Sequence, residues 1–221
     1  MAESTATPPA GVSREAEEAG FYHEAGLNAI WTGSRLALGG LSFLFGAFVF
    51  AYFYLRSINS AGRWHGSGYI PPSTLQGTII LFLVLISASV QYYGLQRIKG
   101  GDKRLWQIAG VTALVLGLGA VAFQIIELLF LPFWPGSSGY SSVFVGFYAV
   151  FLVILLAAMV WLEILLMRSR PIPAISFVEQ PPTYAEAAEL QRFQANLSAF
   201  TTVWNYLAVI AVLFWVLFYA I

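Results

Sequence analysis

Apolar residues fall into five long runs that are separated by shorter polar segments. The runs cover residues 36–55, 75–95, 108–131, 142–167 and 200–221. Each has about the 20 residues that a helix needs to cross the hydrocarbon core of a bilayer, where an open backbone finds no hydrogen-bond partner. The pattern therefore predicts an all-α, polytopic membrane protein with five transmembrane helices.

Polar residues gather at the start of the chain. Residues 1–30 are small and polar, carry five glutamates and lack the apolar segment of a signal peptide. We expect them to form a cytoplasmic tail with a short helix over residues 15–25. Residues 31–221 are then expected to form the five-helix bundle.

A second polar segment, at about residues 168–198, is expected to form a cytoplasmic loop. Within it, Thr183 and Glu186 follow two prolines in the spacing of a capping box. This spacing predicts a short helix from Tyr184 towards Asn196, which would lie on the membrane surface or on a partner subunit.

Basic residues predict the orientation of the chain. Nine of the 11 arginines and lysines lie in the tail and in the second and fourth connecting segments. The first connecting segment holds only Arg56 and Arg63, and the third connecting segment and the C-terminus hold none. The positive-inside rule therefore places the N-terminus in the cytoplasm and the C-terminus outside.

Composition narrows the chemistry that this chain can perform. Hydrophobic residues make up 58% and charged residues 10%, against roughly a quarter charged in soluble domains. Basic and acidic residues balance at 11 each, so nothing suggests a nucleic-acid partner. The chain has no cysteine and only two histidines, His23 and His65, whereas thiolate, haem and copper sites need clustered ligands. We therefore predict no catalytic, cofactor-binding or metal-binding residue in this chain.

Two polar residues stand out within the third apolar run. Gln124 and Glu127 are three residues apart and so share one helix face. A charge at the bilayer centre costs about 2.5–3.5 kcal/mol on insertion scales, and less near the interface. We expect an inward-facing pair that is hydrogen-bonded to the fourth or fifth helix, with Tyr148, Thr202 and Asn205 as candidate partners. A structural tie between helices is the favoured role; a proton-accessible carboxylate or a lipid-headgroup contact is the alternative.

Other residues are expected to serve packing and the membrane interface. Glu163 is expected to pair with the nearby Arg168, and Trp106 to mark an interface, where aromatic residues are enriched. Most aromatic residues are expected to face lipid. Small residues let membrane helices approach closely, and this role is expected for Gly39, Gly40, Gly46, Ala47, Gly110, Ala113, Gly117 and Gly119.

Several short motifs follow one another along the chain in a recognisable order. They are Ala51-Tyr52-Phe53-Tyr54-Leu55-Arg56, then Trp106, Leu116-Gly117, Phe123, Gln124 and Glu127, then Ser141-Ser142-Val143-Phe144, and finally Val203-Trp204. Over about residues 30–221 the chain resembles subunit III of the haem-copper (cytochrome c and quinol) oxidases, in its five-helix bacterial form, as a divergent member.

Three polar clusters of that family are replaced in this sequence. The Ser-Glu of the first helix reads Gly40-Leu41. The Thr-Gly-x-His-x-x-His of the fourth helix falls on residues 145–151, and the terminal Trp-His-Phe-Val-Asp falls on residues 204–208, both without histidine. Only the Gln124–Glu127 pair carries over, so the resemblance implies a scaffold and not a path for protons.

The resemblance implies a cofactor-free accessory subunit of a respiratory haem-copper terminal oxidase in the bacterial inner membrane. Such a subunit would stabilise the catalytic subunit I, contact other oxidase subunits and bind phospholipids, while haem and copper would lie in those partners. An accessory or assembly subunit of a nitric oxide reductase is an alternative. Outside the family, a small proton or cation transporter would use Gln124 and Glu127, but the broken helices and repeats typical of transporters are not evident.

Overall fold

The computed structural model describes residues 14–59, 63–66, 68–179 and 183–221. Five of its helices are long and apolar enough to cross a membrane, which confirms that part of the prediction. The elements are α1 (Arg14–Ile58), α2 (Thr74–Lys99), α3 (Lys103–Leu129), α4 (Gly139–Ser169), a short 3₁₀ helix η1 (Ala174–Phe177), α5 (Tyr184–Trp215) and a π-helix η2 (Val216–Ala220).

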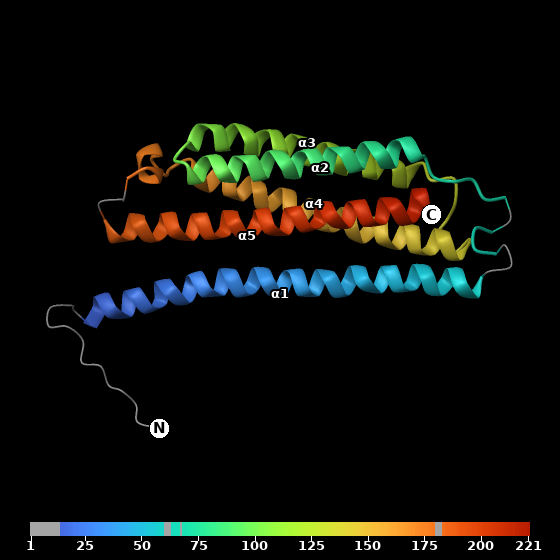
Figure 1. The fold of residues 1–221 in the computed structure, drawn as a ribbon, viewed down its shortest axis with the longest axis horizontal. Helices are drawn as coiled ribbons and strands as arrows, with labels where there is room; N and C mark the ends of the chain where they lie inside the picture. Colours follow the sequence, from blue (N-terminus) through green and yellow to red (C-terminus); the bar gives the residue numbers. More distant parts are fainter. Residues whose placement is uncertain (1–13, 60–62, 67, 180–182) are drawn as a thin grey trace, which may run out of the picture.

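The long helices run roughly parallel or antiparallel to one another (Figure 1). Helices α2 and α3 form an antiparallel pair, joined by a tight turn in which Gly101 has a φ of 88°, a conformation that favours glycine. Helix α5 packs against α2 and α4, and α1 lies along one side of the bundle against α5 and α4. The C-terminus lies at one end of the bundle, and the α2–α3 turn lies at the opposite end.

Two helices are longer than the sequence pattern predicts. Helix α1 begins at Arg14, so the expected short helix is continuous with the first membrane helix. Helix α5 begins at Tyr184, so the expected helix of the fourth loop is the first part of α5 and does not lie apart from it. The start itself agrees with the prediction, because the Glu186 N–H donates to Thr183 Oγ1 at 3.4 Å. Neither helix contains a proline, and adding residues to an existing helix costs far less than starting a new one.

The extended parts of α1 and α5 contact each other. His23 of α1 is almost fully buried, and its Nε2 lies 2.7 Å from Oε1 of Gln191 on α5. These two polar segments therefore continue the bundle beyond its apolar part, at the end that holds the α2–α3 turn.

Aromatic residues build much of the interior, contrary to the expectation that most face lipid. The rings of Phe147 and Phe214 stack with centroids 3.7 Å apart, and Phe45 of α1 packs 5.9 Å from Phe147. Trp106 is fully buried and meets Phe193 of α5 edge to face at 5.5 Å, so its ring packs inside the bundle and does not face lipid headgroups. Burying large rings gives dispersion and area that small aliphatic side chains cannot supply in lipid.

Glycines divide into two groups with different surroundings. In α2 and α3 they allow close approach: a Cβ at Gly94 would lie 2.9 Å from Ala109, and one at Gly110 would lie 2.8 Å from Leu166. In α1 the expectation fails within this chain, because a Cβ at Gly39, Gly40 or Gly46 would meet nothing within 4 Å. Helix α1 lies at the edge of the bundle. Only 11% of the residues in its most apolar stretch are buried, against 39–44% in the other four membrane helices.

Candidate functional site

Gln124 and Glu127 lie in the last two turns of α3, near the end of the bundle that holds the C-terminus. Their side chains are 1% and 2% exposed. Both face the interior of the bundle, where polar atoms need protein partners because hydrocarbon offers none. The structure supplies those partners from α4 and from η2.

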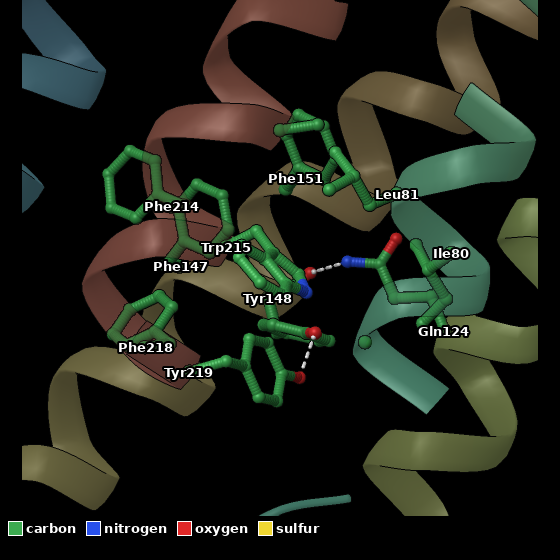
Figure 2. A pocket seen from close by; sticks show the side chains of 12 residues that line it. Ile80, Leu81, Gln124, Phe147, Tyr148, Phe151, Phe214, Trp215, Phe218 and Tyr219 are labelled. Atoms are coloured by element: carbon green, nitrogen blue, oxygen red, sulfur yellow. Dashed lines mark hydrogen bonds between the residues drawn. The ribbon is translucent and has the colours of Figure 1, made fainter. Parts of the chain in front are cut away.

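Gln124 ties α3 to α4. Its Nε2 donates to the backbone carbonyl oxygen of Tyr148 at 3.0 Å (Figure 2). A carbonyl oxygen has two lone pairs, so this carbonyl can accept the amide proton and still serve its own helix. Of the three candidate partners, Tyr148 is therefore the one that the structure brings to Gln124, through its backbone.

Glu127 ends a chain of hydroxyl groups. The hydroxyl of Tyr219 donates to Glu127 Oε1 at 2.7 Å, and the hydroxyls of Tyr148 and Tyr219 lie 2.5 Å apart. The hydroxyl of Tyr219 has one hydrogen and donates it to Glu127. In the contact between the two tyrosines, the hydroxyl of Tyr148 is therefore the donor. The chain therefore runs from α4 through η2 to α3 and links three elements that are far apart in sequence.

The π-helix η2 positions Tyr219 for this contact. A π turn is wider than an α turn and shifts the direction of the side chains that follow it. The hydroxyl of Tyr140 on α4 donates to the carbonyl of Phe218 at 3.0 Å and so anchors the same segment. On the other side, the ring of Tyr219 occupies the space where a side chain at Gly77 of α2 would lie. Sequence reasoning missed Tyr219, since no apolar pattern signals a π turn.

Two other candidate partners lie elsewhere. Thr202 is exposed and donates to the carbonyl of Ser198 on its own helix at 2.9 Å. Asn205 is half-buried and bonds to neither Gln124 nor Glu127. Helix α5 packs mainly against α1, α2 and α4 and hardly meets α3, which the sequence alone does not reveal.

The expected ion pair between Glu163 and Arg168 does not form. Both side chains are exposed, and Glu163 makes no salt bridge with any residue that the structure describes. Five residues at 3.6 per turn separate two positions by about 140° around the helix axis, so the two side chains leave α4 on different sides.

The two histidines lie at opposite ends of α1. His23 contacts α5, whereas His65 lies in the segment after α1 and stacks on Tyr69 with ring centroids 4.2 Å apart. Within residues 14–59, 63–66, 68–179 and 183–221 there is no group of three or more histidine, cysteine, aspartate or glutamate side chains that would hold a metal ion. The interior site consists of one carboxyl, one amide and two phenols, a set suited to hydrogen bonding and proton exchange.

No model of a known protein family matches this chain, and no curated protein matches it either. The five-helix architecture and the hydrogen bonds that tie α3, α4 and η2 together are therefore the basis for a functional proposal, with the motif order along the sequence beside them.

Proposed function

We propose that this chain is a cofactor-free accessory subunit of a respiratory haem-copper terminal oxidase and braces the catalytic subunit in a bacterial cytoplasmic membrane. Haem and copper belong to its partners, its N-terminus faces the cytoplasm and its C-terminus faces outside. The proposal rests on the hydrogen bonds that Gln124 and Glu127 make to other helices. This pair is the polar motif that survives from the family pattern, and it joins helices to one another as a scaffold requires.

The exposed side of α1 supports docking to a larger membrane partner. Gly39, Gly40 and Gly46 leave open space beside α1, and Phe43 and Phe50 are 83% and 69% exposed. Glycine lets two helix backbones approach closely in lipid, and neighbouring aromatic rings then add contact area. A helix of the catalytic subunit fits this role.

A cleft between α1, α2 and α5 supports the lipid-binding part of the proposal. It has a volume of about 400 Å³, and its walls include Leu27 and Trp31 of α1 and Leu95 of α2. Lys99 and Ser198 also line it and offer a positive charge and a hydroxyl. In the proposed orientation the cleft opens on the cytoplasmic side, where anionic headgroups attract lysine. We propose a phospholipid as its occupant.

Affinity purification from native membranes in a mild detergent tests the main proposal. The tagged chain is expected to bring haem-containing subunits with it, visible as a reduced-minus-oxidised absorption spectrum and identified by mass spectrometry. A Gly40→Leu, Gly46→Leu variant should lose most of the haem signal. A Val153→Phe variant, altered on the exposed face of α4, should keep it. Recovery of the wild-type chain as a haem-free monomer or homo-oligomer would refute the proposal.

A second candidate, an accessory or assembly subunit of a nitric oxide reductase, is favoured by the three replaced polar clusters. The same purification separates the two, because the catalytic subunit that accompanies the chain differs between them. A proton or cation transporter predicts instead that the chain alone supports flux in liposomes and that Glu127→Gln abolishes this flux.

A further inference from the structure

A small, partly open cavity lies between α2, α3, α4, α5 and η2. Its volume is about 30 Å³, and most of its wall is apolar, including Ile80, Phe151 and Ala211. Its polar part is formed by Gln124, Tyr148 and Tyr219, the same side chains that tie the helices together (Figure 2). The cavity therefore adjoins the hydrogen-bonded chain that ends at Glu127.

One polar atom at this cavity lacks a partner. Gln124 Oε1 is buried and accepts no hydrogen bond from any residue that the structure describes. The carbonyl of Tyr148 can only accept a hydrogen bond, so the amide nitrogen of Gln124 must lie on its side. The oxygen consequently points away from that carbonyl, and Figure 2 shows it on the side of Leu81, another residue of the cavity wall.

The size and lining of the cavity match a water molecule. A site needs roughly 10–15 Å³ to hold the centre of one water, together with two to four polar partners. The cavity offers about twice that volume. A water placed there would donate one hydrogen bond to Gln124 Oε1, and Tyr148 and Tyr219, whose hydroxyl protons are already donated, offer hydroxyl oxygens as acceptors on the same cavity wall. An unpartnered amide oxygen in hydrocarbon is unfavourable, and the water removes this cost.

We propose that this cavity is a hydration site, in which an ordered water donates a hydrogen bond to Gln124 Oε1 and contacts the hydroxyl pair of Tyr148 and Tyr219. The water joins the two separate ties into one network. Gln124 and Glu127, one turn apart on α3, become the two ends of a single hydrogen-bonded circuit through α4 and η2. This inference is independent of which complex the chain belongs to.

Water-edited solid-state NMR on the full chain in lipid bilayers tests the proposal, with ¹³C-methyl alanine as the label. Magnetisation from water should reach the methyl group of Ala211, which lines the cavity, several-fold more strongly than that of Ala120, which is fully buried on α3 and does not line it. Equal and negligible transfer to both methyl groups in the wild-type chain would show a dry cavity and overturn the proposal.

Three variants separate the water from other sources of signal. Gln124→Met removes the acceptor and should reduce the Ala211 transfer to the Ala120 level. Gln107→Met is the matched control, since it removes an amide bonded to Ser169 near the other end of α3, and should leave the transfer unchanged.

Tyr219→Phe removes an exchangeable hydroxyl but leaves Gln124 in place, so the transfer should persist. Loss in Tyr219→Phe together with retention in Gln124→Met would assign the signal to the hydroxyl and overturn the proposal. If Gln124→Met fails to fold, the wild-type chain and Tyr219→Phe still decide the question.

Discussion

Replacing Tyr219 by phenylalanine isolates the contribution of one hydroxyl to the bundle. The change keeps the ring that packs beside Gly77 and removes only the donor to Glu127 Oε1. Glu127 then loses its hydrogen bond from Tyr219, and the hydroxyl of Tyr148 loses the Tyr219 oxygen as its neighbour. The free energy of unfolding should therefore fall, and the size of this fall measures the tie between η2 and α3.

The expected magnitude follows from two kinds of measurement on other proteins. A buried polar group that is left without a partner costs about 1–3 kcal/mol, whereas hydrogen bonds between membrane helices average about 0.6 kcal/mol with a maximum near 1.7 kcal/mol. Because Glu127 and Tyr148 are buried, Tyr219 is half-buried and two hydroxyl hydrogen bonds are lost, we expect a loss of about 1–2 kcal/mol.

Reversible unfolding of the purified chain in mixed micelles, with increasing sodium dodecyl sulfate, measures this loss. Tyr54→Phe is the matched control: the side chain of Tyr54 is 53% exposed on α1, so its hydroxyl should contribute little. In a Glu127→Leu background, Tyr219→Phe should cost less than it does alone, because its acceptor is already gone. If Tyr219→Phe and Tyr54→Phe unfold at the same detergent fraction, the reasoning about the hydroxyl chain fails.

Four further substitutions test other parts of the structure. Gly77→Ala places a methyl group in the ring of Tyr219 and should destabilise the bundle by about 1–3 kcal/mol, whereas Gly40→Ala meets open space and should stabilise α1 by up to about 1 kcal/mol; unfolding in mixed micelles compares them. If the chain is the proposed oxidase subunit, Glu127→Leu should lower the thermal stability of the purified complex while its initial oxidase rate changes little, and a large loss of proton pumping in an intact complex would contradict the scaffold role. Burial, followed by a neighbouring arginine, lowers the pKa of His65 below its ordinary value of 6.5. The unfolded chain therefore takes up this proton first as the pH falls through about 6.5, so stability should decline slightly, and His65→Gln should flatten this part of the thermal-melting profile.

Hydropathy and length were sufficient to predict the five helices, because a backbone in lipid has no water to bond to and must satisfy its own hydrogen bonds. The same criterion failed at the polar ends of α1 and α5. There the helices continue for another one to two dozen residues, since no proline interrupts them and the two extensions contact each other through His23 and Gln191. Apolar content says where a helix crosses lipid, but not where it stops.

The interior site shows a similar division between local and long-range information. The spacing of Gln124 and Glu127 places both residues on one face of a helix, which is a local property. Their partners depend on how α4 and η2 pack against α3 and on a π turn that brings Tyr219 to Glu127. Likewise, a glycine in α1 and a glycine in α3 look alike in sequence, and only the packing shows that one meets open space and the other a leucine.

The length of α1 has a consequence for what this protein presents to the aqueous phase. At 1.5 Å per residue, its 45 residues span roughly 68 Å, against about 40–45 Å for a whole bilayer with its headgroups. If the apolar part of α1 crosses the bilayer close to its normal, several turns of its polar N-terminal part extend beyond the headgroups, beside the first part of α5. This polar end, formed by the starts of α1 and α5, is then the surface that water-soluble proteins can contact on that side.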